Sequence, residues 1–251
     1  MTNLLEGSSK YGAFQQFSVA KEERVAKIPD HTSFAQASVL PTCFSTALVA
    51  LSAGPGKGFG LPGPSLDPKS LGKIVVVWGA SSSVGLQTLQ VARAAGITTI
   101  ATASPRNFEL VKSAGASLVL DYHAPSVVKD LVRGVQGADE NFVGVVDCIS
   151  EKDTSLKYCI SVLDNLGGGK LGIVKPEMEL DLSANIEVCR IFAFDESTDS
   201  FWKDFLTPAL ENGTLKCLPE PRVVGSGLEC LQDALDTLDK GVSATKLVVQ
   251  L

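Results

Sequence analysis

The sequence predicts an α/β fold in which a doubly wound parallel sheet has helices on both faces. The first observation is the apolar run Ile74–Trp78, which is too short for a helix and rich in β-branched side chains, as is typical of a strand buried on both faces. The second is the turn of small residues Gly79–Ser83 and the helical pattern that follows it. The third is the repeated alternation of strands and helices with short connections, which favours right-handed crossovers and a parallel sheet.

The composition indicates a globular protein with a sizeable core. The chain has 251 residues, of which 45% are hydrophobic, and a net charge of −6. An acidic chain without a run of Lys or Arg argues against nucleic acid or an anionic membrane surface as a partner. The first residues lack the apolar core of a signal peptide, and no segment approaches the length of a membrane span. We therefore expect a soluble, cytoplasmic protein.

Residues 1–53 contain short elements that do not make a complete domain. The expected elements are strand-like stretches at Phe14–Val19 and Arg24–Ile28, a helix capped by Ser33, and a second helix at Cys43–Leu51. Elements this few and this short cannot enclose a core of their own. Residues 54–69 are dense in Gly and Pro and are predicted to form a loop.

Residues 70–210 carry the alternation. The expected strands are Ile74–Trp78, Thr98–Ala103, Leu118–Leu120, Val143–Cys148, Lys170–Val174 and Ile186–Phe192. The expected helices are Val84–Ala95, Arg106–Ser113, Ser126–Gly134 and Thr154–Leu163, and the alternation ends at about Phe194. A further amphipathic helix is expected at Ser200–Glu211, in the C-terminal part. Residues 211–251 add a helix at Gly227–Leu238 and a final strand at Lys246–Leu251, whose partner the periodicity leaves open. In a doubly wound fold, ligands bind at the carboxyl ends of the strands.

The turn Gly79–Gly85 predicts a phosphate-binding site. A strand, a tight turn of small residues and a helix place backbone N–H groups and the positive end of the helix dipole where a phosphate can bind. The spacing G-x-x-x-x-x-G differs from the strict dinucleotide fingerprint. A turn without any ligand is therefore still an alternative at this point.

The end of the next strand favours NADPH over NADH as the ligand. Enzymes that prefer NAD place an acidic residue there to hold the ribose 2′-OH, whereas those that prefer NADP add a basic residue for the 2′-phosphate. No acidic residue occurs between Leu86 and Phe108, and the strand end carries Ser104, Pro105, Arg106 and Asn107. The alternative role of Arg106 is that of a solvated residue at a helix start. A cation in the first turn opposes the helix dipole, however, which favours an anionic ligand.

Other candidate catalytic groups are few. Asp121 and Asp147 end strands and could act as paired carboxylates, although acids at strand ends more often cap the following loop. Cys148 has no histidine or cationic residue near it in the sequence, so we interpret it as a packing residue. The six cysteines are scattered without a C-x-x-C pair, which predicts buried free thiols, and the two histidines have no partner at ligand spacing. No metal site is expected.

Four segments carry a family resemblance: VVVWGASSSVGLQTLQVARAAG, TASPRNFELVKSAGASLVLDY, VVDCIS and GVSATKLVV. Together they resemble the cofactor domain of zinc-independent medium-chain dehydrogenase/reductases, and they are most similar to the fungal trans-enoyl reductases and ToxD-like reductases of secondary metabolism. The resemblance covers roughly residues 12–251. It implies an NADP-binding Rossmann domain at residues 70–210. It also implies that residues 1–53 are the remnant of a GroES-like β domain, to which residues 211–251 return.

The resemblance also implies contacts with NADPH. The residues expected around the pyrophosphate are Ser82, Ser83, Val84 and Gly85, and those expected to hold the 2′-phosphate are Ser104, Pro105, Arg106 and Asn107. Tyr122 is expected near the adenine. Ile173, Val242 and Ser243 are expected near the nicotinamide, and Thr46 is expected near the substrate. The alternatives are a half-buried surface aromatic for Tyr122, a helix cap for Thr46 and a turn residue for Ser243.

The sequence departs from complete family members at its N-terminus. Only the last strands of the substrate domain are matched, by GAFQQFSVAKEERVAKIP, and the family lysine near the substrate belongs to the part without a counterpart. No catalytic residue is therefore assigned. Two functions stay open. The first is an NADPH-dependent reductase of the C=C bond of a small-molecule or carrier-bound enoyl substrate, with a polyketide synthase as partner. The second is a non-catalytic NADPH-binding or partner protein.

Overall fold

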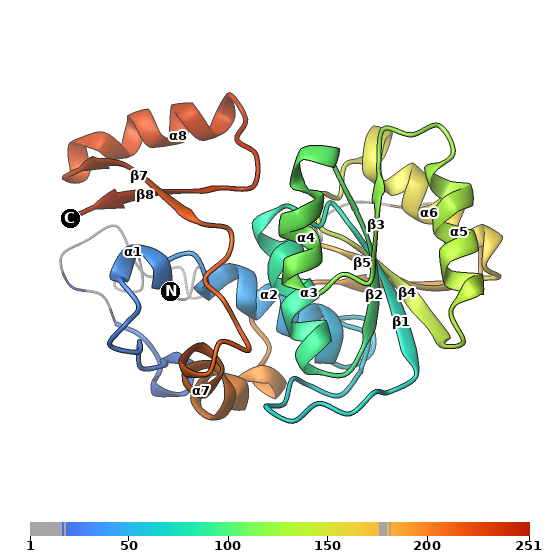
Figure 1. Cartoon of the computed structure of the whole chain (residues 1–251), viewed down its shortest axis with the longest axis horizontal. Coiled ribbons are helices and arrows are strands. Elements are labelled where there is room, and N and C mark those ends of the chain that lie inside the picture. The colour runs from blue at the N-terminus through green and yellow to red at the C-terminus, as the bar shows by residue number, and fades with distance from the viewer. Residues whose placement is uncertain (1–16, 18, 176–179, 181) are drawn as a thin grey trace.

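A parallel sheet of six strands, in the order β3-β2-β1-β4-β5-β6, is the main element of the computed structural model and lies in the right half of Figure 1. The structure describes residues 17, 19–175, 180 and 182–251. Its strands are β1 Lys73–Trp78, β2 Thr98–Ala103, β3 Leu118–Asp121, β4 Asn141–Asp147, β5 Gly169–Ile173 and β6 Ile186–Arg190. Every neighbouring pair is parallel. The predicted doubly wound α/β class is confirmed.

Side chains of β1 alternate between two hydrophobic cores. Val75 and Val77 pack on the face covered by α2 Pro41–Ser52, α3 Ser83–Ala94 and α4 Phe108–Ala114. The opposite face is covered by α5 Val127–Gly137 and α6 Lys157–Asn165, and there Ile74, Val76 and Trp78 pack. Because both faces of the central strand are buried, its consecutive residues are all apolar.

Helix α2 is a core helix, although its composition alone resembles a membrane span. The stretch Phe34–Ser52 has 19 residues and a mean hydropathy of 1.5, which is long and apolar enough to cross a membrane, contrary to the expectation that no segment approaches that length. In the structure it is divided, because α1 Phe34–Ala37 ends before α2 begins at Pro41. Of its most apolar window, 61% is buried inside the protein. Packing against the core accounts for this apolar character.

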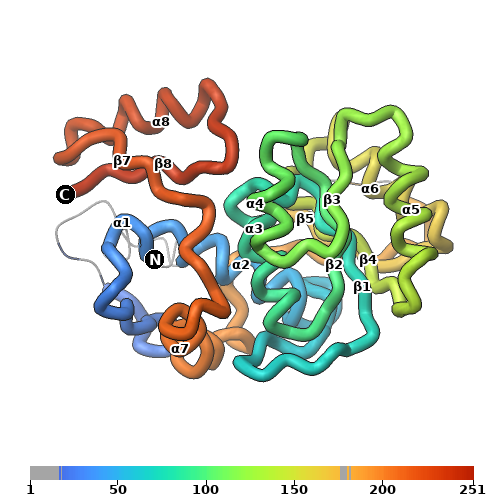
Figure 2. Tube along the Cα trace, viewed as in Figure 1, coloured from blue at the N-terminus to red at the C-terminus, as the bar shows by residue number. Residues whose placement is uncertain are grey.

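The C-terminal part forms a small unit of its own, shown in red in Figure 2. Strands β7 Pro221–Ser226 and β8 Lys246–Gln250 pair in parallel, and α8 Leu231–Asp239 connects them. The unit contacts the N-terminal part, where β7 lies against α1. A two-stranded sheet has little stability by itself, so these contacts matter for keeping the unit folded.

The expected strand at Arg24–Ile28 is wrong. Residues Glu22–Arg24 form a short 3-10 helix, and residues 25–28 pair with no strand in the described part of the chain. The Arg24 guanidinium instead donates to the Asp199 carboxylate at 2.7 Å. Alternation of apolar and charged residues produces a strand only where a partner edge is available. Of the other expected strand, Phe14–Val19, all but residues 17 and 19 lie outside the described residues.

Candidate functional site

Glycine residues allow close packing around the turn between β1 and α3. Gly79, directly after β1, has φ +72°, and a Cβ on it would lie 2.5 Å from Cγ1 of Ile149. Gly85 lies in the first turn of α3, where a Cβ would come within 2.6 Å of the Cα of Ala80. Neither position has space for a side chain, so backbone groups form the surface of the turn.

The start of α3 presents backbone amides that the helix does not use. The Ser82 hydroxyl accepts a hydrogen bond from the Gly85 N–H at 3.1 Å and caps the helix. The N–H groups of Ser83 and Val84, the first two residues of the helix, have no acceptor within it. Free amides at the positive end of a helix form a site for an anion.

A cavity of about 360 Å³, which we call the strand-end cavity, lies at the carboxyl ends of β1, β2, β3 and β4. Its lining residues are Trp78, Gly79, Ser81, Ser82, Ser104, Arg106, Asn107, Tyr122, Ile149, Thr154, Ser155, Tyr158, Val242, Ser243 and Ala244. Segments that are far apart in the sequence meet here, because the parallel strands all end at one edge of the sheet.

The strand-end cavity brings together predicted site residues from four segments: Ser82, Ser104, Arg106, Asn107, Tyr122, Val242 and Ser243. The other predicted residues of the same segments are neighbours of the lining but not part of it: Ser83, Val84, Gly85 and Pro105. Among the described residues, then, the geometry unites the two predicted phosphate sites in one cavity. Their contacts with a cofactor stay predictions.

Ile173 and Thr46 are buried outside the strand-end cavity, and their predicted roles stay predictions. Ile173 is the last residue of β5 rather than a residue after it, and its side chain is fully buried in the core beside α5 and α6. Thr46 lies in the interior of α2, where its hydroxyl donates to the Thr42 carbonyl at 2.7 Å. It is not a helix cap, because the helix already begins at Pro41. Neither side chain lines the strand-end cavity.

Polar contacts join the rim of the strand-end cavity. The Ser104 hydroxyl donates to the Tyr122 hydroxyl at 3.3 Å, and the Asn107 amide donates to the Ser243 hydroxyl at 3.2 Å. The second contact attaches the loop before β8 to the end of β2. Arg106 is exposed on the same rim, and in the described part of the chain it has neither a hydrogen bond nor an ion pair. A guanidinium without a protein partner is available for a ligand.

Sequence reasoning missed the side of the strand-end cavity that is built by β1 and β4. Trp78 ends β1, and its ring stacks on that of Tyr158 at 5.3 Å between centroids and lies 6.5 Å from that of Tyr122. Since β1 and β4 are neighbours in the sheet, the rule that ligands bind at strand ends could have identified part of this side. The missed residues are Trp78, Ile149, Thr154, Ser155 and Tyr158.

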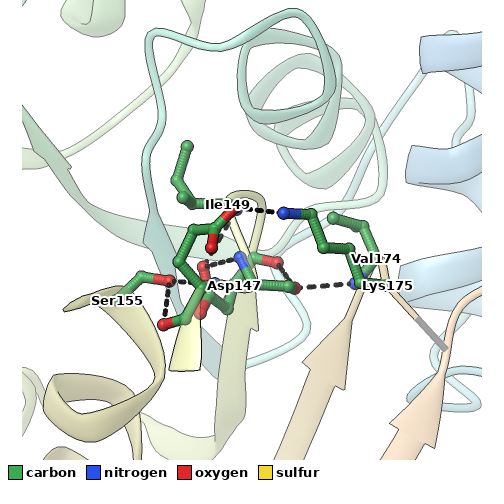
Figure 3. A network of polar contacts seen from close by, with 7 residues as sticks. Asp147, Ile149, Ser155, Val174 and Lys175 are labelled. Carbon is green, nitrogen blue, oxygen red and sulfur yellow. Dashed lines mark hydrogen bonds and ion pairs between the residues drawn. The ribbon is translucent and has the colours of Figure 1, made fainter. Parts of the chain in front are cut away.

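Strand β4 ends in a buried carboxylate, Asp147, that holds the following loop (Figure 3). Its Oδ1 accepts the N–H groups of Ile149 and Ser150, both at 2.9 Å. Asp121 accepts the N–H of His123 in the same manner at 3.0 Å. The interpretation of both acids as caps of the next loop is confirmed. Burial raises the pKa of Asp147, and hydrogen bonds such as that from Ser150 partly offset this effect.

The stability of the Asp147→Asn variant is expected to rise relative to that of the wild-type protein as the pH rises. Because the folded-state pKa is raised, the wild-type side chain contributes stability that is fully present below its unfolded pKa of about 3.9 and is lost as the pH rises through the folded pKa. Asparagine has no such loss. Melting temperatures of both proteins between about pH 4 and pH 7 measure the trend. Asp153→Asn, at an exposed position, is the control. A constant difference between wild type and D147N over this range would contradict the expectation.

The cysteines carry no sign of a reactive thiol. All six are free, as predicted, but Cys217 and Cys230 are only half-buried. Burial raises the pKa of Cys148, which agrees with its interpretation as a packing residue. Burial also raises the pKa of Cys43, although the Lys246 ammonium, 3.9 Å from its sulfur, partly offsets the effect. The Cys43 and Cys148 thiols therefore stay protonated near neutral pH.

Curated relatives match nearly the whole chain. The dehydrogenase orsE of Emericella nidulans is 42% identical over 260 residues, which cover 99% of this chain and 74% of that protein. The trans-enoyl reductase himH of Aspergillus japonicus is 38% identical over 255 residues, covering 99% of this chain and 72% of that protein. The chain thus spans about three quarters of the length of these relatives. No family model matches it.

Solved structures share the fold. The CurK enoyl reductase superimposes with a TM-score of 0.68 at 20% identity, covering 92% of this chain and 67% of that one. A mycobacterial protein solved in complex with NADPH gives a TM-score of 0.66 at 21% identity, covering 96% of this chain and 72% of that one. Because identity with these structures is low, they confirm the architecture alone. Identity with the curated proteins is higher and extends over nearly all of the chain, which therefore belongs to the fungal trans-enoyl reductases and dehydrogenases, a family of oxidoreductases.

Proposed function

We propose that the protein is an NADPH-dependent reductase that acts on the C=C bond of an α,β-unsaturated carbonyl compound. The observation that carries the proposal is the strand-end cavity, which is lined both by Ser82, the N-cap of α3, and by Arg106. Relatives named trans-enoyl reductase, at 38% and 33% identity, support the type of substrate.

The described residues fit a dinucleotide that carries a 2′-phosphate. The free amides of Ser83 and Val84 suit a pyrophosphate, and the missing side chain of Gly85 lets the helix start close against β1. Arg106 and Ser104 lie at the end of β2, where a guanidinium and a hydroxyl suit a phosphate. This strand end lacks the carboxylate that would favour a free 2′-OH.

When bound, the nicotinamide supplies a hydride to the β-carbon of the substrate, while solvent or a protein group protonates the α-carbon. The residues of this chain contribute binding and orientation. The turn between β1 and α3 fixes an anionic group with backbone donors that need no rearrangement. Trp78 is only 4% exposed and closes one side of the strand-end cavity with Tyr158, which excludes water there. Held in this way, a cofactor keeps one orientation toward its substrate.

As part of the same proposal, the protein works in the cytoplasm on a small-molecule or carrier-bound enoyl substrate, with a polyketide synthase as its partner. The relatives named trans-enoyl reductase support the enoyl substrate. A reductase that acts on a carrier-bound chain depends on another enzyme to form the double bond. Copurification with such a synthase is the direct test of this part.

The function is tested by two measurements on the purified protein. NADPH fluorescence reports binding, and loss of NADPH absorbance after addition of a simple enone or an enoyl thioester reports turnover. We expect both signals, with NADH as the comparison cofactor. Binding without turnover would contradict the reductase activity for these substrates and favour a non-catalytic NADPH-binding protein. No binding of either dinucleotide would contradict both functions.

A further inference from the structure

The loop after β4 is held by a buried carboxylate that forms no ion pair among the described residues. Asp147 is 0% exposed, and its Oδ2 has no hydrogen-bond partner in the described part of the chain. Burying a carboxylate costs free energy unless its oxygens are bonded, and here only Oδ1 is, by the N–H groups of Ile149 and Ser150. A buried carboxylate that is retained despite this free-energy cost indicates that the loop after β4 has a role beyond packing.

Ser150 connects this loop to the next strand. Its hydroxyl donates to the Asp147 carbonyl at 2.9 Å and accepts the N–H of Val174 at 2.9 Å, just beyond the end of β5. The serine has φ +54°, a conformation that side chains other than glycine adopt only when their surroundings hold them there. The hydroxyl, which donates one hydrogen bond and accepts another, and the N–H, which donates to Oδ1 of Asp147, provide that hold. Nearby, Lys175 forms an ion pair with Glu151 across the same junction (Figure 3).

The two segments that are joined in this way, which we call the β4 wall and the β5 wall, follow neighbouring strands whose pairing ends at Asp147 and Ile173. Ile149 lines the strand-end cavity and sits directly over Gly79, whose missing Cβ leaves room for it. Val174 follows Ile173 at the end of β5, where the nicotinamide half is expected. The spacing between these walls therefore depends on the contacts of Ser150.

We propose that Asp147, Ser150 and Val174 form a clamp that fixes the spacing between the β4 and β5 walls of the cofactor cleft. Asp147 and Ser150 are then positioning residues, which act through the backbone of Ile149 and Val174. This inference rests on the proposed function. The clamp matters for a ligand that spans both walls and not for one that contacts the β4 wall alone.

The test compares a whole dinucleotide with its adenosine half. Titration calorimetry on Ser150→Ala is expected to show about tenfold weaker binding of NADPH, because displacement of a wall by a fraction of an ångström spoils the fit of a rigid ligand. Binding of adenosine 2′,5′-bisphosphate, which lacks the nicotinamide half, is expected to stay at the wild-type level. Ser150→Gly loses the same hydroxyl but relieves the positive φ, so it keeps the test possible if Ser150→Ala folds poorly.

The matched control is Thr198→Ala. Thr198 is buried, at 2% exposure against 0% for Ser150, and its hydroxyl donates to the Asp195 carbonyl at 2.8 Å, outside the strand-end cavity. It is expected to lower the melting temperature without changing the binding of either probe. Equal weakening of both probes by Ser150→Ala, or no weakening of NADPH, would overturn the clamp alone. Wild-type protein that binds neither probe would overturn the proposed function and the clamp together.

Discussion

Arg106→Ala is expected to weaken NADPH binding by about 10- to 100-fold, while NADH binding changes little. The guanidinium is exposed on the rim of the strand-end cavity, and the described residues offer it no partner, so its loss leaves no protein group unpaired. Hydrogen bonds from a cation to a phosphate are worth about 1.5–3 kcal/mol, and NADH has no 2′-phosphate to receive them. Fluorescence titrations with the two dinucleotides measure the difference.

A second arginine provides the control for charge. The side chain of Arg133 is 71% exposed and lies near the Asp130 carboxylate on α5, at the other end of the sheet from the strand-end cavity. Arg133→Ala removes the same charge and is expected to leave both affinities unchanged. If Arg106→Ala weakened NADH as much as NADPH, the guanidinium would contact a group common to both, and the assignment to the 2′-phosphate would fail.

Phe44→Ala is expected to lower the free energy of unfolding by about 3–5 kcal/mol. Phe44 is 0% exposed on the inner side of α2. Its ring packs edge-on against Trp202 at 5.8 Å and parallel to Phe205 at 6.4 Å, and so joins α2 to the segment before α7 Thr207–Glu211. Removal of the ring leaves a cavity that the surrounding side chains cannot fill. Chemical denaturation measured by circular dichroism gives the difference.

Phe34→Ala is the matched control for this loss. Phe34 begins α1 and is 85% exposed, so the same change in volume is expected to alter the free energy of unfolding by no more than about 0.5 kcal/mol. A loss below about 1 kcal/mol for Phe44→Ala would show that the core around α2 can collapse into the space left by the ring.

The sheet can be predicted because its strands are buried on both faces. A run such as Ile74–Val77 has no other stable place in a soluble fold, so it identifies the strand without knowledge of its neighbours. Strand β7 has no such signal. Its segment Pro221–Ser226 begins with a proline, contains Gly225 and is largely exposed, and its strand structure depends on pairing with β8. Pairing between segments so far apart is not visible in local periodicity.

Part of the candidate site can likewise be predicted from the sequence, and part of it cannot. The turn after β1 and the residues around Arg106 can be predicted because residue type and local order define their chemistry. Tyr158 becomes part of the strand-end cavity only because α6 packs beside the end of β1, which the sequence does not reveal. For Thr46 a usable signal was present. Pro41 is a favourable first residue of a helix, and it would have placed Thr46 in the interior of α2.

The small C-terminal unit is expected to open before the rest of the protein unfolds. No residue of β7, β8 or α8 is buried, whereas the central strands of the sheet are nearly inaccessible to water. Segments that hide little apolar surface separate from the rest at a low free energy, well before global unfolding. The loop with Val242–Ala244, which forms part of the strand-end cavity, directly precedes β8. One wall of the cavity therefore belongs to a part of the molecule that opens easily, and a ligand held against it would slow the exchange of backbone hydrogens in the whole unit.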